Sequence, residues 1–362
     1  MVYHVIGLMS GSSLDGLDIA YTHLTEISGK WTYELECAEC IPYPDELQAA
    51  LRNAAKLPVP DYLKLNTAYG HYIGACVQAF IEKYALQHKV HFVASHGHTV
   101  WHEPAAQTSV QIGEGAAIAA GIQLPVIADL RNMDVALGGQ GAPIVPIADR
   151  LLFADYDFCL NLGGIANVTV NQENPLAFDI CPANQLLDHF ANKMQAPYDD
   201  QGKVARKGNT DAQVLNKAAG LGYYELETPK SLDNNFVHQS VIPCFEHIKN
   251  DADALNTATE HIAQQITKAI APYVDAGKEQ KMLVTGGGAF NSFLIEALQK
   301  SLLTIGKIQL VVPDEGSIKY KEALAMALIG ALRWREETNV LKSVTGASKN
   351  SVGGAMWLPA VD

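Results

Sequence analysis

Apolar residues in the first third of the chain fall into short runs separated by polar and glycine-rich segments. These runs predict strands at residues 3–8, 17–21, 31–40, 91–94 and 124–128. Between the third and fourth runs, apolar residues recur every three or four positions. This spacing predicts a short helix after Pro44 and a long one from Pro60 to about Gln87. Strands that alternate with helices are typical of a largely parallel α/β sheet.

The second half of the chain repeats this opening pattern. Strands are predicted at 158–162, 165–170, 176–178 and 282–285, and helices at 184–194, 210–220, 233–250 and 253–275. The first two of these strands again flank a glycine turn, Gly163-Gly164. A repeat spacing of about half the chain predicts an α/β protein of two lobes with related topology. We place the lobes at residues 1–145 and 146–362, with a C-terminal segment that can pack back on the first lobe.

Composition narrows the class of protein. The chain has 362 residues, 48% hydrophobic and 18% charged, so it can bury enough surface to fold. Its net charge of −13 argues against a nucleic-acid or anionic-membrane partner, because phosphates need basic contacts. The apolar run Ala323–Leu332 is too short to span a bilayer, and the N-terminus lacks a basic signal region. We therefore expect a cytoplasmic protein with reduced cysteines, in which Cys37 and Cys40 are plain thiols rather than a metal knuckle.

The turn between the first two predicted strands is a candidate phosphate site. Its small residues let backbone N–H groups approach a phosphate closely, and Ser12 and Ser13 add hydroxyl groups. Asp15 and Asp18 suit a hydrated Mg²⁺ that bridges such phosphates. A plain polar hairpin loop is the alternative. The candidate nucleotide-binding residues here are Gly11, Ser12, Ser13, Leu14, Asp15, Gly16, Leu17 and Asp18.

Two further glycine turns strengthen the nucleotide hypothesis. Gly163 and Gly164 repeat the first turn at the head of the second lobe, so the two hairpins could clamp a polyphosphate from both sides. The run Gly286–Gly288 follows a strand and leads through Asn291 into a helix, where a ligand can lie on bare backbone. Close strand–helix packing is the alternative for this third turn, although it usually needs one glycine rather than three.

Isolated charged residues are candidates for catalysis and binding. Asp179 follows a strand and precedes a helix, where it can be a general base or a helix N-cap. Arg131 can bind a carboxylate or phosphate, or form a local salt bridge with Asp129 or Asp134. Glu322 lies in the first turn of a predicted helix, where a glutamate often only complements the helix dipole.

Four histidines cluster in one stretch, at His91, His96, His98 and His102. Three nearby imidazoles can bind Zn²⁺, which would make the protein a metallohydrolase. His96 and His98 alternate along an extended segment, however, and Glu103 is the only acidic residue near ligand spacing. We therefore favour a loop that faces a substrate.

Taken in order, these segments resemble the anhydro-N-acetylmuramic acid kinase family, part of the superfamily of actin, sugar kinases and heat-shock ATPases. The resemblance runs essentially end to end. It rests on residues 7–16, 95–100, 129–134, 138–143, 161–167, 286–291, 321–323 and 345–347.

The resemblance implies two ribonuclease-H-like lobes with ATP and Mg²⁺ in a cleft between them. It also implies a cytoplasmic homodimer in a bacterium that recycles its cell wall. The implied substrate is an anhydro amino sugar, whose 1,6-anhydro ring is opened by water while the freed 6-oxygen is phosphorylated. A nucleotide-dependent conformational ATPase of the same fold, which binds a partner protein, is the alternative.

The resemblance also assigns roles to matching residues. Gly11–Asp18 resemble the first phosphate-binding turn, and Gly286–Gly288 resemble the turn on the adenosine side. Asp179 matches the base that deprotonates the attacking water. The candidate catalytic residues are therefore Asp179 and Glu322, and the candidate substrate-binding residues are Ser95, His96 and Arg131. That Arg131 offsets the lactyl carboxylate of the sugar is our own inference.

Three departures from the family pattern are visible. Where the family usually has Asp-Thr-Gly-Pro, this chain has Asp179-Ile180-Cys181-Pro182, which removes a hydroxyl and a flexible glycine beside the base. Ser12 replaces a threonine and keeps its hydroxyl. His98 replaces a glutamine, a change expected to alter contacts with the sugar.

Overall fold

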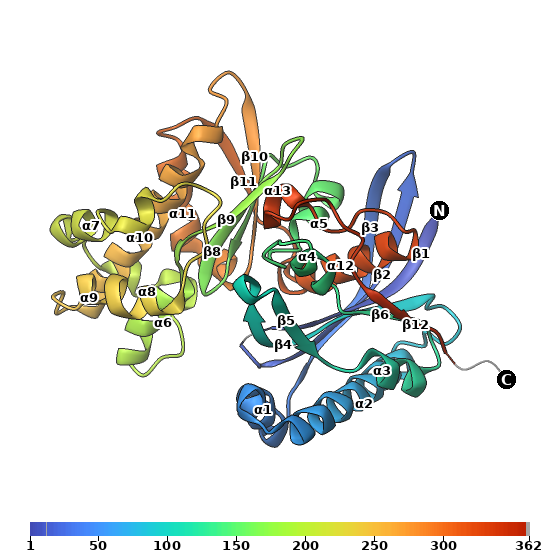
Figure 1. Cartoon of the computed structure of the whole chain (residues 1–362). Coiled ribbons are helices and arrows are strands. Elements are labelled where there is room, and N and C mark those ends of the chain that lie inside the picture. The colour runs from blue at the N-terminus through green and yellow to red at the C-terminus, as the bar shows by residue number, and fades with distance from the viewer. Residues whose placement is uncertain (12, 360–362) are drawn as a thin grey trace. The chain divides into compact units, whose positions relative to one another are not determined.

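A computed structural model of the chain describes residues 1–11 and 13–359 (Figure 1). It divides into two compact units. The first comprises Met1–Leu152 together with the segment from Tyr320 onward, and the second comprises Phe153–Lys319. The predicted boundary between residues 145 and 146 falls inside the first unit. The first unit is therefore discontinuous in sequence, whereas the second is continuous.

The first unit is built on a seven-stranded sheet. Its strands are β1 (Val2–Ser10), β2 (Gly16–Ile27), β3 (Lys30–Pro42), β4 (Phe92–Glu103), β5 (Thr108–Ile112), β6 (Val126–Ala128) and β12 (Ala355–Trp357). They are ordered β12-β6-β4-β1-β2-β3, and β5 pairs with β4 off this path. Strands β1, β2 and β3 are antiparallel neighbours, whereas β4 is parallel to β1 and β6 is parallel to β4.

Helices cover both faces of this sheet because both faces are apolar. The helices of the unit are α1 (Asp45–Asn53), α2 (Val59–Lys83), α3 (Gly115–Ile122), α4 (Asn132–Ala136), α5 (Pro146–Leu152), α12 (Glu315–Trp334, from Tyr320 on) and α13 (Lys342–Thr345). Helices α2 and α3 lie on one side of the sheet (Figure 1). Their buried residues share one core cluster with Ile6 and Leu8 of β1. Gly7 alternates with these residues, and it contacts α12 on the opposite face.

The second unit contains a five-stranded sheet of order β11-β10-β7-β8-β9. Its strands are β7 (Phe158–Leu162), β8 (Ile165–Val170), β9 (Leu176–Pro182), β10 (Glu279–Thr285) and β11 (Lys307–Val311). Its helices are α6 (Asn184–Lys193), α7 (Ala212–Ala219), α8 (Asn234–Phe236), α9 (Ile242–Phe245), α10 (Asp251–Ile270) and α11 (Ser292–Leu302). Apolar faces of α6, α10 and α11 meet the sheet in one core.

The two sheets share one topology. In each, three antiparallel strands follow one another in sequence, and two later strands are added in parallel on the other side of the first strand. This confirms the predicted α/β class with two units of related, ribonuclease-H-like topology. Strand β11 was missed in the sequence because its edge position leaves polar residues at alternate sites. The described residues contain no helix with the length and apolarity needed to cross a membrane.

The contact between Gly7 and α12 yields a prediction for stability. A Cβ at Gly7 would lie 1.9 Å from the backbone oxygen of Ala323, which no side-chain rotation can relieve. We expect Gly7→Ala to lower the free energy of unfolding by about 2 kcal/mol or more, measured by urea denaturation. In the matched control, Gly74→Ala in α2, the added Cβ comes no nearer than 3.6 Å to its neighbours. Because alanine favours helix, this control should gain roughly 0.5–1 kcal/mol. Equal stability of Gly7→Ala and the wild type would contradict the close packing of α12.

Candidate functional site

The first glycine turn joins β1 to β2 and is anchored at one end by burial. Leu14 has a left-handed backbone (φ 59°), and its side chain is buried. Its carbonyl oxygen accepts from Gln48 Nε2 at 2.8 Å, so both groups hold the turn in place. A Cβ at Gly16 would lie 2.6 Å from Cys40 Sγ on β3. The close pairing of β2 with β3 therefore accounts for a glycine at this position. Ser13 and Asp15 are exposed, and Ser13 Oγ donates to Asp15 Oδ1 at 2.7 Å. The predicted residue Ser12 lies outside the described residues.

Carboxylates gather beside this turn. Asp18 is half-buried in β2, opposite Met9 on β1 and Cys40 on β3. Burial raises the pKa of Asp18 to about 6. The Cys40 thiol donates a hydrogen bond to the carboxylate and opposes this shift. The negative charges of Asp15 and Glu322 add to the shift. The structure thus brings together three of the predicted acidic residues, whereas Leu17 is buried in the core.

Glu322 lies directly after a break in its helix. Helix α12 begins at Glu315 and leaves helical geometry at Tyr320 (φ −111°, ψ 15°), so Glu322 falls in the first turn of the helical segment that follows the break, as predicted. The neighbouring Lys321 is buried and pairs with Asp149 at 2.7 Å. Glu322 itself keeps an accessible surface, yet desolvation by surrounding protein raises its pKa, and the charges of Lys321 and Arg131 oppose that shift.

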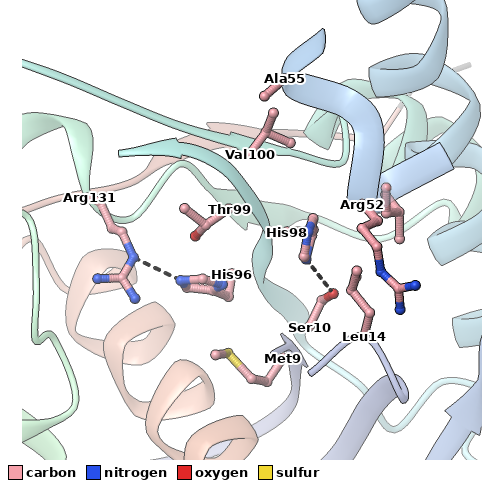
Figure 2. Close-up of a pocket in the computed structure, with 11 residues that line it drawn as sticks. Met9, Ser10, Leu14, Arg52, Ala55, His96, His98, Thr99, Val100 and Arg131 are labelled. Carbon is pink, nitrogen blue, oxygen red and sulfur yellow. Dashed lines mark hydrogen bonds between the residues drawn. The ribbon is translucent and has the colours of Figure 1, made fainter. Parts of the chain in front are cut away.

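Arg131 is held by two neutral acceptors rather than by an aspartate. Its Nε donates to His96 Nε2 at 2.8 Å (Figure 2). Its Nη1 donates to the Gly141 carbonyl oxygen at 2.6 Å. Among the residues that the structure describes, neither Asp129 nor Asp134 forms an ion pair with it, so the salt-bridge alternative is wrong. The two contacts use two of the five guanidinium N–H groups.

His96 is neutral and fixed in one tautomer. Because Nε2 accepts from Arg131, the proton resides on Nδ1, which donates to the Gly97 carbonyl oxygen at 2.9 Å. Burial, assisted by the charge of Arg131, lowers the pKa of His96 to about 3. Burial also lowers the pKa of Arg131 to about 10, so its guanidinium stays charged at neutral pH. The pair therefore presents one positive charge.

A fully buried carboxylate, Asp134, holds the loop that supports Arg131. Its Oδ2 accepts from the Gly141 amide at 2.8 Å, and its Oδ1 accepts from Thr345 Oγ1 at 2.7 Å. The Gln140 amide donates to the Thr345 carbonyl oxygen at 2.8 Å. The charge of Asp134 does not by itself predict this supporting role from the sequence. The two segments 138–143 and 345–347, which both resemble family segments, are the sequence feature that points to it, because the structure places them in contact.

A pocket of about 410 Å³ lies between the end of β1, α1 and β4 (Figure 2). Its lining comprises Met9, Ser10, Leu14, Leu51, Arg52, Ala55, His96, His98, Thr99, Val100 and Arg131. This volume suits a small ligand. Of the predicted substrate residues, His96 and Arg131 line the pocket. Ser95 does not: it is buried beside them, and its Oγ accepts from the Gly97 amide at 3.3 Å.

His98 is oriented by a chain of hydroxyl groups. Tyr43 donates to Ser10 Oγ at 2.7 Å, and Ser10 Oγ lies 3.3 Å from His98 Nδ1. Because burial lowers the pKa of His98, the ring is neutral; a Ser10 donor to Nδ1 leaves its proton on Nε2. The glutamine that the family usually has here would offer an amide in place of this N–H group.

The predicted histidine cluster does not assemble a metal site. His91 Nδ1 accepts from the His4 amide at 3.2 Å, and His102 Nδ1 lies 3.0 Å from Ser109 Oγ. His96 and His98 are engaged as described above. Within the described chain, none of these four belongs to a group of three close metal-ligating side chains. The geometry gives no support to the zinc hydrolase alternative.

In the second unit, a polar row crosses the sheet. Thr285 on β10 opposes Asn161 on β7, which opposes Asn167 on β8, which opposes Asp179 on β9. Directly opposed residues share a face, so the four side chains lie on the face opposite the apolar core. In the sequence, Asn161 and Asn167 stand out only as members of the segment 161–167. Their alignment with Asp179 depends on strand register, which the sequence does not show.

Asp179 is not a helix cap. Helix α6 begins at Asn184 with Ala183 at its N-cap position, and Asp179 lies within β9. Its Oδ2 accepts from the Leu232 amide at 2.9 Å, which leaves Oδ1 as the oxygen without that contact. Burial raises the pKa of Asp179, and the Leu232 hydrogen bond opposes the shift.

The two glycine turns of the second unit touch each other. Gly286 has φ +80°, and a Cβ there would lie 2.5 Å from Asn161 Oδ1; a Cβ at Gly288 would lie 2.7 Å from Leu162 Cβ. Close packing therefore accounts for two of the three glycines in the run, whereas Gly287 has nothing nearer than 3.4 Å. On the other turn, the carbonyls of Gly163 and Gly164 accept from amides at the start of α6.

Asn291 serves as the N-cap of α11, where its side chain accepts from the Leu294 amide at 3.1 Å.

The two residues beside Asp179 that depart from the family pattern belong to the core. Ile180 and Cys181 are 1% and 0% exposed, and burial raises the pKa of the Cys181 thiol. Burial also raises the pKa of Cys37 to about 11 and of Cys40 to about 12, which agrees with inert thiols.

Two ribonuclease-H-like units, each with a glycine turn between its first two strands and a half-buried aspartate, Asp18 on β2 or Asp179 on β9, agree with a nucleotide-dependent sugar kinase. A family model described as anhydro-N-acetylmuramic acid kinase matches residues 3–359, and the chain belongs to this family.

Relatives named anhydro-N-acetylmuramic acid kinase match over nearly their whole length. The chain is 34% identical over 378 residues to the protein of Azorhizobium caulinodans, covering 98% of this chain and 99% of the relative. It is 33% identical over 386 residues to that of Salinibacter ruber, covering 98% and 96%. Among solved structures, component A of Acidaminococcus fermentans (R)-2-hydroxyglutaryl-CoA dehydratase has a TM-score of 0.47 at 15% identity, covering 90% of this chain and 96% of that one.

The raised pKa of Asp18 predicts a pH dependence of stability. An ordinary aspartate in the unfolded chain ionises near 3.8, whereas Asp18 in the folded chain keeps its proton up to about 6. Between these values the unfolded chain binds fewer protons, so folding loses stability as the pH rises. Asp18→Asn removes this loss, on the order of 1–2 kcal/mol after allowance for solvent screening. Urea unfolding of both proteins from about pH 4 to about pH 7 should show the variant gaining on the wild type. A difference independent of pH would contradict the assignment.

Proposed function

We propose that the protein is an ATP-dependent kinase that hydrolytically opens the ring of 1,6-anhydro-N-acetylmuramic acid and phosphorylates its 6-oxygen. The products are N-acetylmuramic acid 6-phosphate and ADP, and the reaction recycles cell-wall sugar. Membership of the anhydro-N-acetylmuramic acid kinase family over residues 3–359 is the observation that carries this conclusion. The positions of Asp179, Arg131 and the glycine turns support the roles given below.

The reaction couples two bond changes. Water attacks the anomeric carbon and the bond from that carbon to the bridging 6-oxygen breaks. The 6-oxygen forms a bond to the γ-phosphorus, whose bond to the ADP oxygen breaks. One water proton must be removed, and Asp179 is our candidate base. Its half-buried carboxylate has one oxygen fixed by Leu232 and a pKa raised toward the working pH, which suits proton transfer.

In the first unit, Arg131 is the candidate partner for the lactyl carboxylate of the sugar. His96 and Gly141 hold its guanidinium at two N–H groups, so the remaining groups can bind a carboxylate without a large loss of side-chain entropy. Because His96 is neutral, it orients Arg131 without cancelling its charge. Glu322 offers a carboxylate that can accept from a sugar hydroxyl. Ser95 remains a candidate for substrate binding in an indirect way, because its hydroxyl oxygen accepts from the Gly97 amide and so fixes the backbone of β4 beside His96.

The glycine turns are the candidate nucleotide sites. Gly11 through Asp18 are assigned to phosphates, as are Gly163 and Gly164, and Gly286–Gly288 with Asn291 are assigned to the adenosine side. Exposed Ser13 and the open backbone at Gly287 support this assignment. Asp15 and Asp18 provide oxygen donors of the kind that hydrated Mg²⁺ takes, and Asp18 is ionised above its pKa of about 6. Bound Mg²⁺ would neutralise phosphate charge. A raised Mg²⁺ requirement in Asp18→Asn would agree with this role, and an unchanged one would contradict it.

We further propose a cytoplasmic homodimer. Its use of ATP supports the location, and the homodimer is what the resemblance to the family implies. Light scattering of the purified chain tests the second point, since a mass of one 39.1 kDa chain would contradict it.

Isotope labelling tests the coupled reaction. The full chain is supplied with 1,6-anhydro-N-acetylmuramic acid, MgATP and ¹⁸O-water, and the products are analysed by mass spectrometry. We expect one ¹⁸O on the anomeric carbon of the phosphorylated sugar for each ADP formed. Formation of ADP without labelled sugar phosphate would show an ATPase and overturn the proposal.

Substitution tests the base. Asp179→Asn keeps the size of the side chain but cannot take a proton, so we expect kcat to fall by at least about 100-fold while ATP binding is retained. Asp188→Asn is the matched control, because Asp188 is a partly buried carboxyl in the same unit, with a pKa raised by burial to about 6. It should keep near-normal turnover. Near-normal turnover in Asp179→Asn would remove the base assignment.

A further inference from the structure

A row of ionisable side chains crosses one end of the first unit's sheet, on residues that the proposed reaction does not use. The strand register places His4 on β1 opposite His23 on β2, and His23 opposite Glu34 on β3. His91 comes directly before β4, and its amide donates to the His4 carbonyl oxygen at 2.8 Å. Directly opposed residues share a face, so the row presents imidazoles and a carboxylate side by side.

Three imidazoles in this row are stacked. The ring centroids of His4 and His23 are 4.2 Å apart, and those of His4 and His91 are 4.8 Å apart with an interplanar angle of 6°. His4 is fixed further because its Nδ1 donates to the Lys89 carbonyl oxygen at 3.2 Å. The stack therefore sets the plane of the His23 ring from one side.

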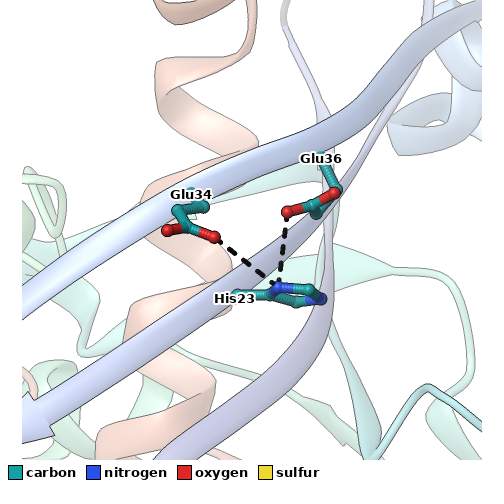
Figure 3. A group of neighbouring side chains, drawn as sticks. All are labelled: His23, Glu34 and Glu36. Carbon is teal, nitrogen blue, oxygen red and sulfur yellow. Dashed lines mark ion pairs between the residues drawn. The ribbon is translucent and has the colours of Figure 1, made fainter.

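A β-bulge supplies a second carboxylate. Tyr21 opposes Cys37 and Thr22 opposes Leu35, so Glu36 is the extra residue on β3. His23 Nδ1 lies 3.4 Å from Glu36 Oε1 and 3.9 Å from Glu34 Oε2 (Figure 3). One ligand atom from each of the three residues lies within 4.8 Å of the others.

The other ring nitrogen of His23 is also engaged. His23 Nε2 lies 3.1 Å from the hydroxyl oxygen of Tyr21, a side chain only 2% exposed. If Nε2 carries the proton and donates to Tyr21, the lone pair on Nδ1 faces two carboxylates. Three acceptors that converge in this way favour a cation between them. A histidine whose second nitrogen is held by a neighbour is also the usual arrangement of a metal ligand.

We propose that His23, Glu34 and Glu36 form a binding site for a divalent zinc ion, with water completing the coordination. Zinc accepts imidazole nitrogen and carboxylate oxygen at about 2.0–2.2 Å, which in tetrahedral geometry places ligand atoms about 3.4 Å apart. Ligand atoms within 4.8 Å of one another reach this spacing through small movements of two flexible glutamate side chains. An ion here would tie β2 to β3, so its effect falls on the hairpin and is independent of the proposed kinase reaction.

The competing interpretation is a protonated His23 that forms ion pairs with the two glutamates. In that case the group satisfies itself and binds no metal. The two interpretations differ in a measurable way, because a proton leaves no saturable zinc site.

Zinc titration distinguishes them. The full chain is stripped with a chelator, kept free of nucleotide and Mg²⁺, and titrated with Zn²⁺ against a chromophoric chelator near pH 7.5. We expect one tight equivalent in the wild type, and at least about 100-fold weaker binding in His23→Asn and in Glu36→Gln. Matched controls are His71→Asn and Glu46→Gln, which change exposed residues of the same unit. These should bind as the wild type does. Circular dichroism verifies that each variant is folded.

X-ray absorption at the zinc edge gives a second readout. We expect a first shell of one imidazole nitrogen with oxygen atoms only. Hydrogen exchange of β2 and β3 should slow on adding Zn²⁺ to the wild type and not to His23→Asn. The proposal is overturned by the absence of a tight equivalent, by equal binding in His23→Asn, or by a shell that contains sulfur.

Discussion

The first unit depends on the direct contact between the backbone of α12 and the middle of β1. At Gly7 the strand has no side chain, and the oxygen of Ala323 occupies the space where a Cβ would stand. Farther along, a Cβ at Gly330 would lie 2.5 Å from Ala94 Cβ, and Trp334 stacks on Phe92 with ring centroids 5.1 Å apart. Small residues on both partners bring helix and sheet to backbone distance. The position of Glu322 follows from this contact, since it precedes Ala323 directly.

Burial, more than ion pairing, sets the charge of the site residues. His96 loses its proton because it is desolvated beside a cation, and Asp18 and Asp179 hold theirs more tightly because water is partly excluded. Arg131 stays charged although its partners are neutral. A chain with a net charge of −13 can thus keep one guanidinium available to an anion. Global acidity describes its surface and says little about this pocket.

Much of the fold followed from the sequence, because alternating and helical patterns mark β1, β2, β7, β8, α2 and α10 directly. The strands that were missed are short or polar at alternate positions, as in β11. For the site, the sequence named Asp18, Asp179 and Arg131 as candidates. It could not show that Arg131 binds His96 instead of an aspartate, nor that Asn167 aligns with Asp179. Both facts depend on register and on contacts between distant segments, which local patterns do not encode.

The tie between Asp134 and Thr345 closes the first unit with residues from the far end of the chain. The same holds for β12, which pairs with β6, and for α12 on β1. During synthesis on the ribosome, the continuous second unit has all its residues before the first unit does. The sheet face around Gly7 is therefore not covered by α12 until the segment from Tyr320 onward has emerged from the ribosome. The N-terminal unit, although made first, is the last to be completed.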